Sequence, residues 1–114
     1  MSDQTPRVSG AFQMFFQAAP AHAAAWMQAV RALDNASVLD KKTEELVHIS
    51  LLAALRLETG LPFHVQLARQ AGASREEVIS AILVGLPLVG QAVTQAIPVA
   101  LAAYNADQGG TTSV

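Results

Sequence analysis

Apolar and polar positions follow one another along this chain with the period of a helix. No segment shows the one-in-two alternation that is typical of a strand. The pattern predicts six helices, at about 9–17, 20–33, 41–58, 63–70, 75–84 and 88–104. In the second of them Trp26, Val30 and Leu33 recur at helical spacing, as the apolar face of a packed helix would. We therefore expect an all-α fold, a compact bundle of about six helices.

Residues that stop or start helices divide the pattern at several points. Asp40 precedes the third helix and can accept hydrogen bonds from its open backbone N–H groups. Ser74 and Glu77 have the spacing of a capping box at the start of the fifth helix. Pro98 should bend the last helix, because proline cannot donate a backbone hydrogen bond. These signals leave a series of short helices without repeats or linkers.

The length of 114 residues suits one domain with a single core. We expect residues 8–106 to form that helical domain. Residues 1–7 and 107–114 are polar or rich in glycine, serine and threonine, and we expect them to be flexible termini.

The composition is too apolar for a single small core. Hydrophobic residues make up 52% of the chain and charged residues only 14%, against roughly 25% charged in an average soluble domain. Such a chain either enters a membrane or buries its helices against copies of itself. Residues 78–106 carry no charge and could span a bilayer, but Pro87 and Pro98 interrupt them and no Lys/Arg cluster flanks them. We therefore expect no membrane span and a homo-oligomer, with Phe12, Phe15, Phe16 and Met14 packed against a neighbouring subunit.

Several other classes of function are not supported. A formal net charge of −2 gives no electrostatic case for nucleic acid. The chain has no cysteine and no glycine-rich phosphate loop, and the spacing of its three histidines is not that of a metal site, so we expect neither a cofactor nor a metal. Ala21-His22-Ala23 has the form of a signal-peptide cleavage site, but Gln13 and Gln17 break the preceding apolar run. We expect a cytoplasmic protein.

Residues 39–82 contain a series of motifs in a particular order. An acidic helix start, Leu39-Asp40-Lys41-Lys42-Thr43-Glu44-Glu45, is followed by a break at Gly60-Leu61-Pro62, then His64, then Ala71-Gly72-Ala73 and Glu76-Glu77-Val78-Ile79. This order resembles the core of the carboxymuconolactone decarboxylase / AhpD-like family. The resemblance implies an AhpD-like helical bundle, and it implies that the oligomer is a homotrimer or homohexamer.

The chain departs from that family where redox chemistry would be performed. The redox members carry a CxxC pair seven and four residues before the histidine, and here those positions are Leu57 and Gly60. A second family histidine falls on Thr59, and the glutamate of the decarboxylase members is replaced at Gly60. Without a thiolate no peroxide can be attacked and no disulfide reduced, so thiol peroxidase activity is excluded.

An acid–base group remains, and its catalytic candidates are Glu45, His64 and Glu58. By resemblance, Glu45 is the family glutamate, nineteen residues before His64. Burial among apolar residues would raise the pKa of Glu45, and a nearby imidazole would counter this. His48 shares a helix face with Glu45. Each residue also has a structural interpretation: Glu45 as a helix-dipole partner, Glu58 as a solvated helix end, and the histidines as packing residues.

Two functions follow from these residues. The first is an oligomeric, cysteine-independent lyase-like enzyme that performs acid–base chemistry on a small carbonyl or carboxylate compound through Glu45 and His64. The second is a non-catalytic oligomeric domain of the same fold that binds a small ligand or a protein. Arg56 could bind a substrate carboxylate, but we favour a structural ion pair with Glu58 or Glu45.

Overall fold

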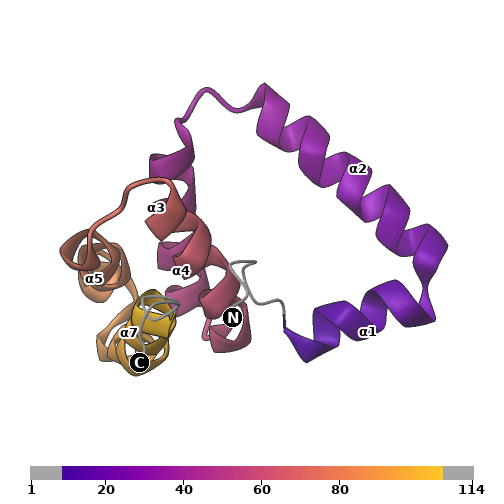
Figure 1. Cartoon of the computed structure of the whole chain (residues 1–114). Coiled ribbons are helices and arrows are strands. Elements are labelled where there is room, and N and C mark those ends of the chain that lie inside the picture. Colours follow the sequence, from indigo (N-terminus) through magenta and orange to yellow (C-terminus); the bar gives the residue numbers. More distant parts are fainter. Residues whose placement is uncertain (1–8, 107–114) are drawn as a thin grey trace.

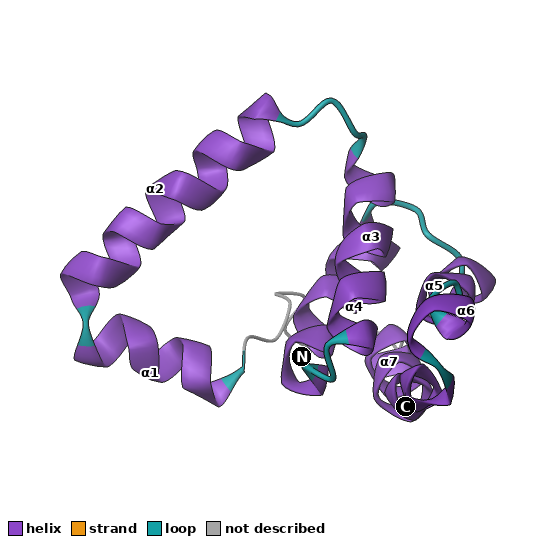
Figure 2. Cartoon of the chain, turned by 180° about the vertical axis from the view of Figure 1, so that it is seen from behind, coloured by secondary structure: helices purple, strands orange, loops and turns teal. Residues whose placement is uncertain are grey.

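The structure is a computed structural model that describes residues 9–106 of the chain. Within that range every regular element is helical, as Figures 1 and 2 show. In chain order these are α1 (Gly10–Ala18), α2 (Pro20–Ala36), α3 (Lys41–Ala54), the 3₁₀ helix η1 (Glu58–Gly60), α4 (Leu61–Gln70), α5 (Arg75–Leu83), α6 (Leu86–Val89), the 3₁₀ helix η2 (Gln91–Gln95) and α7 (Ala96–Ala106). The all-α prediction is confirmed.

The hydrophobic core lies within α3–α7. Helix α4 packs against both α3 and α7, and α5 also contacts both of those helices. The core has larger side chains on α3, α4 and α5 and small ones on α7; its largest fully buried apolar residues are Ile49, Leu61, Val65, Val78, Ile82 and Val93. Ala96 and Ala100 are fully buried on α7. Their small side chains let α7 approach α4 closely, and this fixes α4 between its two neighbours.

Helices α1 and α2 form an arm that stands away from this core (Figures 1 and 2). The two helices contact each other, and of their residues only Ala23 is buried. The radius of gyration is 14.8 Å, above the roughly 13 Å of a compact domain of this length. The expected bundle is thus formed by α3–α7, and the predicted apolar face of the second helix is largely exposed.

The helix starts agree with the capping signals. Asp40 accepts a hydrogen bond of 2.8 Å from the backbone N–H of Thr43, and this bond is the main cause of the lowered pKa of Asp40. Ser74 accepts from the N–H of Glu77 at 3.0 Å, while Glu77 accepts from the N–H of Ser74 at 2.9 Å. The capping box is therefore complete and sets the start of α5.

The third predicted helix ends earlier than residue 58. Helix α3 stops at Ala54, and Arg56 adopts a left-handed backbone conformation with φ of 60°. The N–H of Leu57 then closes on the carbonyl of Leu52 at 2.9 Å, a hydrogen bond that ends a helix with one left-handed residue. Glycine usually takes that position, so the arginine gave no stop signal in the sequence.

The last predicted helix is also divided in the structure. Gly90, with φ of 90°, separates α6 from η2, and α7 begins only at Ala96. Pro98 lies in the first turn of α7 and not in the middle of a long helix as expected, so its missing N–H has no partner to lose within α7. Within residues 9–106 no helix is both long enough and apolar enough to cross a bilayer. The termini expected at 1–7 and 107–114, and residue 8, lie outside the described residues.

Candidate acid–base site

Helix α3 places two of the polar side chains of this site. Its start is set by the Asp40 cap, and its inner face packs Ile49 and Ala53 into the core. Glu45 lies on that inner face, one turn before Ile49, and is buried. His48 follows three residues after Glu45, so its ring lies beside the carboxylate on the same helix.

Helix α4 places the third side chain. Its first residues, Leu61 and Pro62, follow directly on η1, and Leu61 and Val65 are fully buried against α3. His64 is therefore held between two anchored core positions. Gly60 comes close to α3 here, because a Cβ at Gly60 would lie 3.2 Å from the side chain of Leu52.

The three side chains meet at a single carboxylate oxygen. Glu45 Oε1 lies 2.7 Å from His64 Nδ1 and 3.3 Å from His48 Nδ1. The two imidazole rings are 4.9 Å apart and nearly perpendicular, and the Phe63 ring lies 5.1 Å from that of His64. The side chain of Glu45 is only 2% exposed, whereas that of His64 is 27% exposed. The site thus has a buried carboxylate behind an imidazole that reaches the surface.

The electrostatics favour an ionised Glu45. Burial acts to raise the pKa of this carboxyl, but the hydrogen bonds and charges of His64 and His48 outweigh it, and the net result is a lowered pKa. Lys41 Nζ lies 3.3 Å from Glu45 Oε2, one turn back along α3. The opposing effects of burial and imidazole expected from the sequence are both present, and the imidazoles prevail.

An ionised Glu45 fixes the tautomer of His64. Because a carboxylate only accepts hydrogen bonds, His64 must carry its proton on Nδ1, which leaves the Nε2 lone pair free. Nε2 can then take up a proton, and the carboxylate stabilises the imidazolium that results. This arrangement can move a proton to and from a bound molecule at the surface of α3 and α4.

Glu58 is not joined to this group by the interactions of the described residues. Its Oε2 accepts from Nε of Arg56 at 2.9 Å, and the same guanidinium donates to the side-chain oxygen of Gln95. Arg56 is therefore the structural ion-pair partner, which was one of the two interpretations of that residue. Sequence reasoning paired Glu45 with His64, and it gave no role to Lys41, although the four-residue spacing between Lys41 and Glu45 is a local signal for an ion pair.

Glu45, His48 and His64 also have the composition of a metal-ligand set. One ligand atom from each lies within 4.8 Å of the others, so the three donors could hold a divalent cation after small shifts. The histidine spacing alone did not indicate this, because Glu45 and His64 come from different helices. In the described structure these donors already bond to each other, and the ammonium of Lys41 balances the carboxylate charge without an ion.

Comparison with known families identifies the class to which this fold and site belong. The family model of the carboxymuconolactone decarboxylase family matches residues 15–102, most of the chain. The chain belongs to the carboxymuconolactone decarboxylase family. Comparison with curated proteins and with solved structures gave no match. The match includes the arm from Phe15 onward, α3 and α4, so the site and the arm both lie within the family domain.

Proposed function

We propose that this protein is a cysteine-independent acid–base catalyst that acts on a small carbonyl or carboxylate compound in the cytoplasm. The observation that carries the proposal is the 2.7 Å contact between the buried Glu45 carboxylate and Nδ1 of the partly exposed His64. A histidine oriented in this way is suited to general acid–base catalysis near neutral pH.

The roles of the residues follow from their protonation states. Nε2 of His64 removes a proton from the carbon next to a substrate carbonyl, and the electron pair of that C–H bond passes into an enolate. His64, now an imidazolium held by Glu45, returns the proton to carbon. In a decarboxylation the C–C bond to the carboxylate breaks instead, CO₂ leaves, and an imidazolium already protonated at Nε2 delivers its proton to the carbanion.

Glu45 is a positioning residue in this scheme. Its lowered pKa makes it a weak base, and its carboxylate lies behind the imidazole, where a substrate cannot reach it directly. His48 donates to the same oxygen at 3.3 Å and so holds the carboxylate in place. Thiol-based peroxidase chemistry has no part in the proposal, because the chain has no cysteine.

The test uses carboxymuconolactone, the compound in the family's name, together with a panel of lactones and β-keto acids in D₂O. CO₂ release and the exchange of carbon-bound protons, followed by NMR, are the two measurements. The wild-type protein should catalyse at least one of them. His64→Gln should lower the rate by roughly 10²-fold or more. Glu44→Gln, on the same helix but outside the hydrogen-bonded group, is the control and should leave the rate unchanged.

Two results would refute the proposal. If His64→Gln retains turnover, His64 is not the base of the reaction. The absence of both reactions across the whole panel would favour the second candidate, a binding domain without turnover. One observation favours that candidate: the group contains a single carboxylate, since Glu58 is engaged by Arg56. A binding domain should show ligand-induced stabilisation that is equal in the wild type and in His64→Gln.

A further inference from the structure

Three side chains that can bind metal ions converge on one oxygen in this fold. Glu45, His48 and His64 each offer one donor atom, and these atoms lie within 4.8 Å of one another. Among the histidine, cysteine, aspartate and glutamate side chains of residues 9–106, they form the one such group of three or more. Two imidazole nitrogens and a carboxylate oxygen are a donor set of zinc sites in which water takes the fourth position.

The distances between these donors are close to those that a zinc ion requires. Bonds of about 2.0–2.1 Å in a tetrahedron place neighbouring ligand atoms roughly 3.4 Å apart. Glu45 Oε1 and His48 Nδ1 are already 3.3 Å apart. Glu45 Oε1 and His64 Nδ1 are 2.7 Å apart and must separate by roughly 0.7 Å. A small rotation of the His64 side chain achieves this, and that side chain is free to turn outward because it is 27% exposed.

The glutamate is already held in the orientation of a ligand. Its side chain is 2% exposed and lies on the core side of α3, so it cannot turn into water. Oε1 faces the two histidines, while Oε2 faces Lys41 Nζ at 3.3 Å. The carboxyl is ionised near neutral pH, because its pKa is lowered. A charged donor with a fixed direction binds a cation with little further loss of conformational freedom.

We propose that Glu45, His48 and His64 bind a zinc ion through Glu45 Oε1 and Nδ1 of each imidazole. The side chains of His48 and His64 are 36% and 27% exposed, so the ion can enter from the surface and keeps its fourth position open to water. Mg²⁺ and Ca²⁺ are not expected at this site, because they prefer oxygen ligands and a larger number of them.

Lys41 is the group that opposes a second positive charge at the site. Its ammonium lies against the oxygen that faces away from the histidines, and its side chain is 53% exposed. It can turn into water when the ion binds, and an ion pair with so exposed a partner contributes little. The hydrogen-bonded group of the structure is therefore the metal-free form of the site, in which Lys41 and two imidazole N–H groups satisfy the carboxylate.

Zinc and the proposed base compete for the same imidazole, a consequence that rests on the proposed function. Without an ion, His64 carries its proton on Nδ1 and keeps the Nε2 lone pair free. A zinc ion at Nδ1 displaces that proton to water, and the ring takes up a proton from water at Nε2, so the ring stays neutral. Nε2 then has no lone pair with which to remove a substrate proton. Zinc therefore inactivates the base.

The first test measures the binding of zinc chloride to the untagged chain, freed of metal with EDTA and dialysed. Isothermal titration calorimetry should show one zinc ion per chain, and magnesium chloride should give no binding. Glu45→Gln, His48→Gln and His64→Gln should each lower the zinc affinity by about 10-fold or more.

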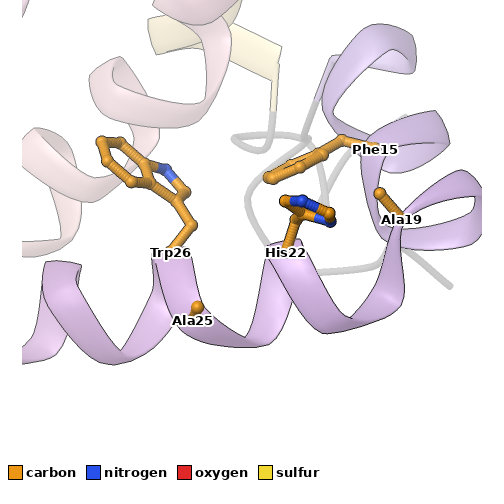
Figure 3. A pocket seen from close by; sticks show the side chains of 5 residues that line it. All are labelled: Phe15, Ala19, His22, Ala25 and Trp26. Atoms are coloured by element: carbon orange, nitrogen blue, oxygen red, sulfur yellow. The ribbon is translucent and has the colours of Figure 1, made fainter.

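The third histidine of the chain provides the matched control. His22 lies on α2 in an open hollow of the arm, with Phe15 and Trp26 (Figure 3), and the chain has no cysteine that could bind zinc instead. His22→Gln should leave the zinc affinity unchanged. If His22→Gln weakens binding as much as the site variants do, or if no site variant weakens it, the protein holds an adventitious ion only and the proposal is wrong.

Two spectroscopic measurements use the wild-type chain, so they stand even where a variant fails to fold. Co²⁺ bound in place of Zn²⁺ should give the intense visible absorption of a four-coordinate ion; the weak absorption of a six-coordinate ion would contradict the assigned geometry. Long-range ¹H–¹⁵N NMR correlations should show the ring protons of His48 and His64 on Nδ1 without metal and on Nε2 with Zn²⁺. Rings that keep the Nδ1 proton while Zn²⁺ is bound would place the ion elsewhere and overturn the proposal.

Turnover separates this site from the proposed function. In the D₂O assay, one equivalent of Zn²⁺ should lower the rate by about 10²-fold or more, and EDTA should restore it. A rate that bound Zn²⁺ leaves unchanged, or that requires Zn²⁺, would overturn the competition at His64. Binding is measured without a substrate. A protein that binds zinc at these residues without any turnover therefore keeps the site and loses the proposed function, and one that turns over without binding zinc does the reverse.

Discussion

Replacing Glu45 by glutamine tests the electrostatics of the site without a substrate. The substitution keeps the size of the side chain and removes only its charge. The carboxylate accepts from His64 at 2.7 Å and from His48 at 3.3 Å, in a position that is almost closed to water. A glutamine oxygen at the position of Oε1 can still accept both of these bonds, but the NH₂ group then takes the position of Oε2 and faces the ammonium of Lys41, which is also a donor.

The expected cost is about 2 kcal/mol near neutral pH. A hydrogen bond to a charged group contributes about 1.5–3 kcal/mol and one between neutral groups about 0.5–1.5 kcal/mol, so the loss of charge on the His64 bond costs about 1 kcal/mol. The mispaired NH₂ group adds a similar amount. The contact with Lys41 adds little, because that ammonium is largely exposed. For a chain of this size the total corresponds to a fall of about 8 °C in melting temperature.

The cost should depend on pH in a defined direction. The pKa of Glu45 is lowered in the folded protein, so the stability that its charge contributes is complete above the ordinary value of 4.5 and is lost as the pH falls through the lower, folded-state pKa. Glu45→Gln has no such group. The difference in melting temperature between the two proteins should therefore be largest at about pH 7 and should narrow below the ordinary value.

Thermal unfolding followed by far-UV circular dichroism, at a fixed protein concentration, measures this difference. Glu44→Gln is the matched control. It removes one negative charge from the residue that precedes Glu45 on α3, and it should lower the free energy of unfolding by only about a few tenths of a kcal/mol. Two results would show that Glu45 is not held as a carboxylate. One is a difference in melting temperature between the wild type and Glu45→Gln that stays constant down to about pH 3; the other is a Glu45→Gln protein more stable than the wild type at about pH 7.

Two further predictions concern helix ends. Ser74→Ala removes the hydrogen bond from the N–H of Glu77 and should lower the free energy of unfolding by about 1 kcal/mol. Denaturant unfolding should show this as a lower midpoint with an unchanged slope, and an unchanged midpoint would mean that the capping box does not contribute to stability. Arg56→Gly should be more stable than Arg56→Ala by about 1 kcal/mol, because both lose the same hydrogen bonds and only glycine relieves the left-handed conformation; equal midpoints would contradict this.

Features that depend on a few neighbouring residues were predictable from the sequence. Asp40 and Ser74 mark the starts of their helices through bonds to backbone groups three residues away, and both bonds are present. Such features need no knowledge of the rest of the fold.

Features that depend on distant contacts were not predictable in the same way. The helical spacing of Trp26 and Leu33 predicts an apolar face but cannot tell whether the chain's own core or another molecule covers it. The end of α3 at Ala54 depends on Arg56, whose left-handed conformation is accompanied by bonds to Glu58 and, across the fold, to Gln95.

The site was predictable in part. Resemblance to a family gave the spacing between Glu45 and His64, and the structure brings the two side chains into contact. The ionised state of Glu45 was not predictable, because it is the outcome of opposing effects of burial and of two imidazoles. Glu58 was a catalytic candidate because of its position in the sequence, but in the structure its partner is Arg56. Position in the sequence was therefore not sufficient to identify the members of the site.

The order of the helices along the chain has a consequence for synthesis. The arm leaves the ribosome before α3–α7, yet it contributes nothing to the core cluster. Helix α4 packs between α3 and α7, and the core alanines of α7 extend to Ala103. The core therefore cannot close until nearly all of the described chain has emerged, and the apolar side of the arm stays in water throughout that time. The core of this domain therefore closes late in the synthesis of the described residues, and nascent chains that carry the arm are exposed to aggregation or to chaperones until α7 has been made.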